Sequence, residues 1–285
     1  MRIAVTGGLG RLGRYIVEAL LPAHDVLAID RVPPDGTLPA VQADLTDLAA
    51  LRSALDGIEA VIHIGGIDRS VGAPEQATLE TNVIGTWNLF AASRAAGVRR
   101  VVLCSSTAVT GIDHSNPGMP PLYLPIDEDH TLRPTDAYAV SKRTGETIAE
   151  AFARDGTMEV LTLRPAFIAF PGMRDFMAGR SSGEDGRAEP MPHLRAYIGP
   201  EDCARAFLLA ATSTKYAGYM AMFIAADDCF ADEPTVERLS ALYGVSLPVR
   251  QPALYMAEPL ASPIDSSRGK QFLGWRPTTR WRRFG

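Results

Sequence analysis

A glycine-rich stretch near the start of the chain indicates the fold more clearly than any other part of the sequence: Ile3-Ala4-Val5-Thr6-Gly7-Gly8-Leu9-Gly10-Arg11-Leu12-Gly13. Its apolar beginning predicts a short buried strand, and its glycines predict a tight turn. Apolar residues at helical spacing between Arg14 and Leu21 predict a helix. A strand, a glycine turn and a helix in this order form a phosphate-binding unit, because a pyrophosphate can approach the turn and the helix N-terminus attracts its charge.

The glycines fit two related spacings. Gly8, Gly10 and Gly13 match GxGxxG, and Gly7, Gly10 and Gly13 match GxxGxxG. Asp30 follows a second predicted strand, about 20 residues past the central glycine, where a carboxylate accepts the hydroxyls of an adenosine ribose. The alternative is that the glycines serve only a tight turn, and the position of Asp30 argues against it.

Apolar runs and helical patterns alternate over the first third of the chain. This alternation predicts an α/β fold, with a Rossmann-type doubly wound parallel sheet and right-handed crossovers. We expect strands at 41–45, 60–64, 100–104, 159–163 and 219–225, and helices at 48–55, 79–96, 136–153 and 200–211. Residues 112–134 and 167–194 are predicted to be long loops or irregular. Ligands of such sheets bind beyond the carboxyl ends of the strands, where Gly65-Gly66 and Ser105-Ser106-Thr107 are expected.

Composition narrows the function classes. A net charge of −5 does not favour nucleic-acid binding. No apolar run approaches the roughly 18 residues of a membrane span, and we expect no secretory signal. The three cysteines (Cys104, Cys203 and Cys229) form no CxxC pair and predict a reduced, cytoplasmic setting. The five histidines lack HxxxH spacing, so we expect no metal site.

Tyr138 and Lys142 are the clearest candidates for chemistry. They are four residues apart in a predicted helix and therefore share one face. An ammonium beside a tyrosine favours the phenolate, so Tyr138 can act as a base or acid, and Lys142 can also donate to ribose hydroxyls. Ser106, after a predicted strand, could hydrogen-bond the reacting hydroxyl or carbonyl. The alternative is a surface tyrosine beside a solvated lysine, because this spacing is common.

Several motifs occur in order along nearly the whole chain. They are Thr6-Gly7-Gly8-x-Gly10-x-x-Gly13, Asp30, Asp44-Leu45, His63-Ile64-Gly65-Gly66, Asn82-Val83-x-Gly85-Thr86-x-Asn88-Leu89, Ser105-Ser106-x-x-Val109-x-Gly111, Tyr138-x-x-x-Lys142, Leu163-Arg164-Pro165 and Leu273-Gly274-Trp275-x-Pro277. Together they resemble the extended short-chain dehydrogenase/reductase family, the NAD-dependent epimerase/dehydratase group. The resemblance implies an NAD-binding Rossmann domain (residues 1–165 and 200–226) and a small C-terminal substrate-binding subdomain (residues 166–199 and 227–285).

The resemblance also implies a catalytic set of Ser106, Tyr138 and Lys142. The residues that it implies for binding the cofactor are Gly7, Gly10, Arg11, Leu12, Gly13, Asp30, Arg31, Asp44, Leu45, Ile64, Gly65, Gly66, Asn82, Tyr138 and Lys142. Asp44 and Leu45 would contact the adenine, whereas Asn82 would lie near the cofactor or serve a structural role. Asp30 favours NAD because its charge repels a 2′-phosphate. Arg11 and Arg31 keep NADP as an alternative.

The substrate class follows partly from departures from the family pattern. Thr107 and Ala108 stand where the 4,6-dehydratase subgroup has an Asp–Glu pair, which sets dehydration aside. The short tail and the segment 63–67 look more similar to uronate dehydrogenase-like members. A carboxylate substrate calls for an arginine, and Arg174 and Arg195 are the candidates; the alternative for each is a solvated surface position. Ser106 and Thr107 are the further candidates for contacting the substrate.

The leading hypothesis is an NAD-dependent oxidoreductase that oxidises a hydroxyl of a sugar or sugar acid by hydride transfer. One alternative is a nucleotide-sugar 4-epimerase with tightly bound NAD, and another is a non-catalytic cofactor-sensing regulator on the same fold. We expect the protein to bind a small carbohydrate substrate, and we expect neither a nucleic acid nor a membrane as a partner. The resemblance further implies a homodimer that packs the helices at about 79–96 and 136–153.

Overall fold

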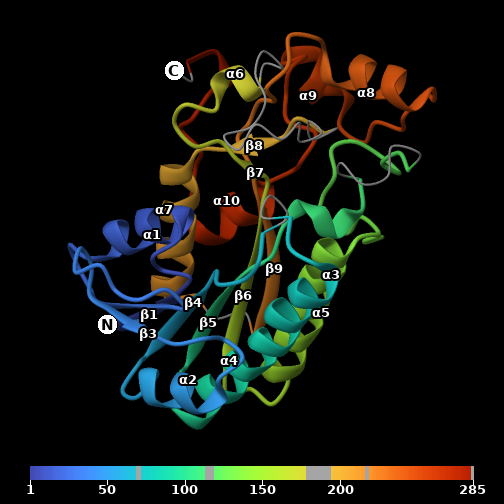
Figure 1. Cartoon of the computed structure of the whole chain (residues 1–285). Coiled ribbons are helices and arrows are strands. Elements are labelled where there is room, and N and C mark those ends of the chain that lie inside the picture. Colours follow the sequence, from blue (N-terminus) through green and yellow to red (C-terminus); the bar gives the residue numbers. More distant parts are fainter. Residues whose placement is uncertain (69–71, 113–118, 178–193, 216–217, 284–285) are drawn as a thin grey trace. The chain divides into compact units, whose positions relative to one another are not determined.

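The protein contains a seven-stranded sheet, and the glycine turn joins its first strand, β1, to the first helix, α1 (Figure 1). The computed structural model describes residues 1–68, 72–112, 119–177, 194–215 and 218–283. The strand order is β3-β2-β1-β4-β5-β6-β9, and the pairings from β3 through β6 are parallel. This order is that of a doubly wound sheet, which confirms the predicted fold class. The strands are β1 (Arg2–Thr6), β2 (Asp25–Asp30), β3 (Ala40–Gln42), β4 (Ala60–His63), β5 (Arg100–Cys104), β6 (Glu159–Pro165) and β9 (Tyr219–Ile224).

Helices cover both faces of this sheet. Figure 1 shows α1 and α7 on one face and α2, α4 and α5 on the other. Asp47 caps α2, because its Oδ1 accepts the N–H groups of Ala49 and Ala50 at 3.0 Å. The bounds of these helices are α1 (Arg11–Leu20), α2 (Leu48–Ala54), α4 (Gly85–Ala95), α5 (Ala137–Ala153) and α7 (Pro200–Thr212).

The helix predicted at 79–96 begins earlier and is not regular. It consists of α3 (Glu75–Leu79), one π-helical turn, η2 (Glu80–Ile84), and then α4. The prediction of its start was wrong, and apolar spacing gives no sign of a π turn, which adds one residue to a helical turn. The turn carries Asn82, whose side chain is buried.

Two other predicted segments also differ from the structure. The strand predicted at 159–163 continues through Pro165 as β6. The region predicted as irregular (residues 167–194) contains β7 (Phe167–Ile168) and a helical turn, α6 (Arg174–Met177). β7 pairs in parallel with β8 (Tyr197–Ile198), which lies just after that region. Residues 178–193 of that region lie outside the described residues.

The chain divides into two compact units. The first unit comprises Met1–Ser105, Ala137–Leu163 and Ala204–Ala221, and the second comprises Ser106–Asp136, Arg164–Cys203 and Met222–Gly285. The first unit has a core between the sheet and α2, α4 and α5, to which Leu51, Phe90 and Phe152 contribute. The second unit contains η3 (Thr107–Thr110), α8 (Thr235–Tyr243), α9 (Pro252–Ala257), α10 (Ser267–Leu273) and η4 (Trp281–Arg283) besides β7, β8 and α6. Which unit binds the cofactor and which the substrate stays a prediction.

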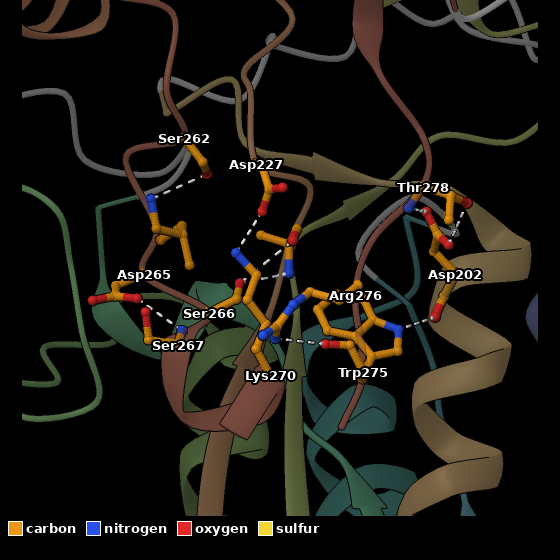
Figure 2. Close-up of polar contacts among 12 residues, drawn as sticks. Asp202, Asp227, Ser262, Asp265, Ser266, Ser267, Lys270, Trp275, Arg276 and Thr278 are labelled. Carbon is orange, nitrogen blue, oxygen red and sulfur yellow. Dashed lines mark hydrogen bonds and ion pairs between the residues drawn. The ribbon is translucent and has the colours of Figure 1, made fainter. Parts of the chain in front are cut away.

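Aspartates fasten the C-terminal segment (residues 274–281) inside the second unit (Figure 2). The carbonyl of Asp202, in the first turn of α7, accepts the indole N–H of Trp275 at 2.9 Å. The carboxylate of Asp202 accepts the N–H of Thr278 at 2.7 Å. Asp227 forms an ion pair with Arg280 at 2.8 Å. Residues distant in sequence therefore hold this segment in place, which the apolar pattern alone does not predict.

In the part of the chain that the structure describes, no helix is long and apolar enough to cross a membrane. The three cysteines are all thiols. Among the same described residues, no group of three or more His, Cys, Asp or Glu side chains could hold a metal ion.

Candidate cofactor and active site

The glycine turn after β1 is tightly packed on its inner side and open on its outer side. A Cβ on Gly13 would lie 2.1 Å from the carbonyl oxygen of Gly7, and one on Gly8 would lie 2.6 Å from Cβ of Ala28. Only glycine therefore fits at these positions. A Cβ on Gly10 would approach only the Gly7 carbonyl oxygen, at 3.2 Å. The open side of Gly10 is where a phosphate group could approach the backbone.

The N-terminus of α1 fits an anionic ligand. Gly10 is its N-cap, so the helix has no side-chain cap at this position. The first turn, which begins with Arg11 and Leu12, carries no acidic residue in the described positions 11–14. The N–H groups at a helix N-terminus and the helix dipole favour a pyrophosphate at this point.

Asp30 lies at the carboxyl end of β2, beside the glycine turn. Its Oδ2 accepts the N–H of Leu9 at 3.1 Å, and its Oδ1 accepts the N–H of Val32 at 3.4 Å. The carboxylate is half-buried and Arg31 after it is exposed. The predicted ribose-binding carboxylate is thus held against the loop that would contact the phosphates.

Asp44 and Leu45 follow β3 in the same unit. Oδ1 of Asp44 accepts the N–H of Thr46 at 2.8 Å and its hydroxyl at 2.7 Å, which lowers the pKa of Asp44. A Cβ on Gly65 would lie 3.2 Å from Cδ1 of Leu45, and one on Gly85 would lie 2.6 Å from Cβ of Leu45. Leu45 therefore packs against glycines at the end of β4 and the start of α4.

A buried hydrogen-bonded chain passes through His63, the last residue of β4. Its Nδ1 lies 2.7 Å from the hydroxyl of Thr6, and its Nε2 lies 3.0 Å from the hydroxyl of Thr86. The Thr86 hydroxyl donates to the carbonyl of Asn82 at 2.6 Å, so it must accept from His63. Nε2 therefore carries the proton and Nδ1 accepts from Thr6, whose oxygen also accepts the N–H of Gly65 at 3.3 Å. Burial lowers the pKa of His63 to about 3 and keeps the ring neutral.

Asn82 connects the segment after β4 to α5. Its Oδ1 accepts the N–H of Ile67 at 2.7 Å, and its Nδ2 donates to the Ile67 carbonyl and to the hydroxyl of Ser141, both at 3.0 Å. The Ser141 hydroxyl in turn donates to the carbonyl of Tyr138 at 2.7 Å. A Cβ on Gly66 would lie 2.8 Å from Oδ1 of Asn82. The contacts of Asn82 are with the protein itself, and its contact with a cofactor stays a prediction.

Tyr138 and Lys142 come together on α5 as predicted. Nζ of Lys142 donates to the carbonyl of Cys104 at 3.0 Å, and lies 5.7 Å from the centre of the Tyr138 ring. Cys104 ends β5, so this pair lies at the carboxyl end of a central strand. Ile64 is at the equivalent end of β4, where its N–H donates to the Thr6 carbonyl at 3.3 Å. The pair therefore shares the first unit with the glycine turn.

The predicted substrate-contacting residues all belong to the second unit. Ser106 caps η3, because its hydroxyl accepts the N–H of Ala108 at 3.1 Å, and Thr107 after it is buried. The guanidinium of Arg174 lies 5.6 Å from the ring of Trp281. Arg195 has a left-handed backbone with φ of 50°. Their catalytic and substrate-binding roles stay predictions.

Sequence reasoning assigned no role to the hydrogen bonds around His63. His63 and Thr6 end adjacent strands and pair in register in the sheet, although they are far apart in the chain. A threonine and a histidine at the carboxyl ends of two predicted strands were the available signal. The strand order that makes them neighbours is not visible in the sequence.

Comparison with known proteins identifies relatives along the chain. Residues 3–219 match the model of a family described as "NAD dependent epimerase/dehydratase family". An NAD-dependent glucose-6-phosphate dehydrogenase of Haloferax volcanii is 32% identical, over 57% of this chain and 66% of its own length. A uronate dehydrogenase of Agrobacterium fabrum is 36% identical, over 53% and 55%. The chain thus spans between about half and two thirds of these two relatives. A UDP-glucose 4-epimerase of Corynebacterium glutamicum is 26% identical, over 97% and 91%.

A solved structure gives the same result for the fold. A short-chain dehydrogenase/reductase superfamily protein from Agrobacterium tumefaciens, with bound NAD, has a TM-score of 0.73 and 24% sequence identity. The match covers 100% of this chain and 94% of that chain. The resemblance stated from the motifs is confirmed by these findings.

Proposed function

This chain belongs to the NAD dependent epimerase/dehydratase family, and we propose on that basis that it is an NAD-dependent oxidoreductase oxidising a hydroxyl of a sugar or sugar acid. The observation that carries the proposal is the pair of Tyr138 and Lys142 at the end of β5, in the unit that also contains the glycine turn. NAD, when bound, supplies the acceptor for the hydride of the substrate. NADP is the alternative cofactor.

The cofactor is held by residues of the first unit. The glycine turn and the N-terminus of α1 bind the pyrophosphate. Asp30 accepts the hydroxyls of the adenosine ribose. Asp44 and Leu45 lie against the adenine, and Lys142 donates to the second ribose. The open side of Gly10 and the uncapped helix are the features that support this placement.

The proton is handled by three side chains. Tyr138 accepts the proton of the substrate hydroxyl, because the ammonium of Lys142 stabilises its phenolate. The hydroxyl of Ser106 hydrogen-bonds the reacting oxygen and orients it. The C–H bond breaks as the carbonyl forms, so the substrate loses one proton and one hydride.

The substrate class rests on the relatives. Two relatives bear the names of dehydrogenases of glucose-6-phosphate and of uronate, which are both anionic sugars. Thr107 contributes a hydroxyl to the substrate, and Arg174 or Arg195 pairs with its negative group.

Tyr138→Phe tests the role of the phenol. NADH formation with a panel of uronic acids, aldoses and sugar phosphates should fall by about 10²-fold or more, while NAD binding by calorimetry stays unchanged. Tyr219→Phe is the matched control. It removes a tyrosine hydroxyl from the edge strand β9 and should leave NADH formation unchanged. Equal rates for the two variants would remove Tyr138 from the mechanism.

A nucleotide-sugar 4-epimerase is the second candidate, supported by the nearly full-length alignment with the epimerase of C. glutamicum. An epimerase returns the hydride to the opposite face of the sugar and forms no net NADH. Mass analysis of the purified protein distinguishes the two functions: tightly held NAD with no net reduction favours the epimerase. NAD binding with no conversion of these sugars or of nucleotide sugars favours the third alternative, the cofactor-sensing regulator.

We also propose a cytoplasmic homodimer. Large apolar side chains are exposed on α3, η2, α4 and α5 of the first unit, namely Leu79, Ile84, Trp87 and Val140; Ile84 and Trp87 are about half exposed, at 52% and 51%. An apolar face of this kind is typical of an interface between copies. Sedimentation should show a dimer at micromolar concentration and a monomer for Trp87→Glu. A monomeric unmodified protein contradicts the proposal. Thiols at all three cysteines are consistent with a reducing compartment.

A further inference from the structure

A three-way clamp joins α1 to the loop between β2 and β3 (residues 31–39). The guanidinium of Arg14 donates to the carbonyl of Leu9 at 3.2 Å, to the hydroxyl of Thr37 at 2.9 Å and to Oδ2 of Asp35 at 2.6 Å. Oδ1 of Asp35 accepts the N–H of Thr37 at 3.0 Å and its hydroxyl at 2.6 Å. Nε, Nη1 and Nη2 of Arg14 therefore each have an acceptor, and each oxygen of the Asp35 carboxylate has a donor.

The clamp is attached to the same residue as the predicted ribose-binding carboxylate. Leu9 donates its N–H to Asp30 and accepts the guanidinium of Arg14 on its carbonyl. The guanidinium of Arg14 and the carboxylate of Asp30 thus bind the carbonyl and the N–H of the same residue, Leu9, in the glycine turn. A guanidinium at such a place attracts a phosphate group on the adenosine ribose, because it can bind phosphate oxygens in bidentate geometry.

Asp35 cancels this attraction. Its ion pair with Arg14 at 2.6 Å uses the guanidinium edge that a phosphate would need. Hydrogen bonds from the Thr37 hydroxyl and N–H and from Arg14 lower the pKa of Asp35, so its carboxylate is charged at neutral pH. Arg31, the next cation along the loop, lies near the carboxylate of Asp44.

We propose that Asp35 determines cofactor specificity: by holding and neutralising Arg14 beside the ribose site, it makes the site accept NAD and disfavour NADP. This inference rests on the proposed function, since it assumes that a dinucleotide binds at the glycine turn. Asp30 repels a 2′-phosphate directly. Asp35 acts through another side chain, by withholding a cation that would otherwise attract that phosphate.

Asp35→Asn tests the proposal, because an asparagine can still accept the two hydrogen bonds from Thr37 while losing the charge. Dissociation constants for NAD⁺ and for NADP⁺ are measured by calorimetry at low ionic strength. The ratio of NADP⁺ to NAD⁺ affinity should rise about three- to tenfold, and the gain should shrink with added salt because exposed charges are screened.

Asp155→Asn is the matched control. Oδ1 of Asp155 also accepts the N–H and the hydroxyl of the threonine two residues on, Thr157, at 3.0 and 2.6 Å. This turn precedes β6 and so lies at the amino ends of the parallel strands, whereas the glycine turn lies at their carboxyl ends. The substitution removes the same charge from the same kind of turn, and it should leave the affinity ratio unchanged.

The double variant Asp35→Asn with Arg14→Gln identifies the cation. It should lose the gain in NADP⁺ affinity, because the guanidinium that Asp35 releases is no longer there. An unchanged ratio in Asp35→Asn, or a gain that survives in the double variant, overturns the inference while NAD⁺ binding by the unmodified protein still supports the proposed function. Absence of NAD⁺ and NADP⁺ binding in the unmodified protein overturns both.

Discussion

Replacement of Asp202 by alanine should be among the most destabilising single changes in the second unit. The side chain is fully buried and its oxygens accept two N–H groups, of Thr278 and Thr279, both at 2.7 Å, and the Thr278 hydroxyl at 2.9 Å (Figure 2). Hydrogen bonds to a charged group contribute about 1.5–3 kcal/mol each and are not additive. Because alanine leaves three donors without this acceptor, we expect a loss of about 3–5 kcal/mol in the free energy of unfolding.

At acidic pH, the unmodified protein and Asp202→Ala should differ less in their free energy of unfolding. Burial alone would raise the pKa of Asp202, but the N–H groups and hydroxyls of Thr279 and Thr278 outweigh it and the net pKa is lowered. A carboxyl whose pKa is lowered on folding stabilises the protein at neutral pH, and this contribution is lost as the pH falls through the lowered value. The deficit of Asp202→Ala should therefore be largest near neutrality and smallest in strong acid.

Urea denaturation followed by tryptophan fluorescence measures the effect, because Trp275 and Trp281 belong to the same C-terminal region. Thr278→Val removes only the hydroxyl donor and should cost about 1 kcal/mol. Glu201→Gln changes the neighbouring exposed charge of the same helical turn and should stay within about 0.5 kcal/mol. A loss for Asp202→Ala no larger than that for Glu201→Gln would show that the Asp202 carboxylate does not stabilise the C-terminal segment.

Two further predictions concern the first unit. Unmodified protein should lose about 1.4 kcal/mol per pH unit through His63 as the pH falls from its ordinary pKa of about 6.5 towards 4, because the unfolded chain binds a proton that the buried ring does not. His63→Leu should be less stable at neutral pH but lack this acid-dependent loss, as measured by urea denaturation at several pH values; equal pH dependence in both proteins contradicts the assignment. Arg100→Ala should cost about 3 kcal/mol, because the guanidinium forms a buried ion pair with Glu159 and donates to the last carbonyls of α7. Arg99→Ala, at an exposed neighbouring arginine, is the control in thermal denaturation, and equal losses for both variants would show that burial of the ion pair does not matter.

The parts of the fold that were predicted well depend on local patterns. The strand, glycine turn and helix at the start of the chain are encoded by neighbouring residues, and so is the four-residue spacing of Tyr138 and Lys142. These features appear in the structure because helix periodicity and glycine conformations act over a few residues.

The failures lie where distant contacts outweigh local preference. The π turn at Asn82 follows no local pattern, and the amide of Asn82 bonds to Ile67 and to Ser141 on α5. β6 continues through Pro165, although the strand was predicted to end at Leu163. Strand pairing and packing in the folded chain decided both outcomes.

The alternation of strands and helices, the glycine turn, the carboxylate at the end of β2 and the tyrosine–lysine pair can all be predicted from the amino-acid order, because each depends on residues close together in the chain. The pairing of polar groups depends on the three-dimensional fold: His63 bonds to Thr6, and Arg14 to Asp35. Strand order and loop conformation bring these groups within hydrogen-bonding distance. No spacing in the sequence gives that, since a hydrogen bond requires an approach of about 3 Å in space whatever the separation along the chain.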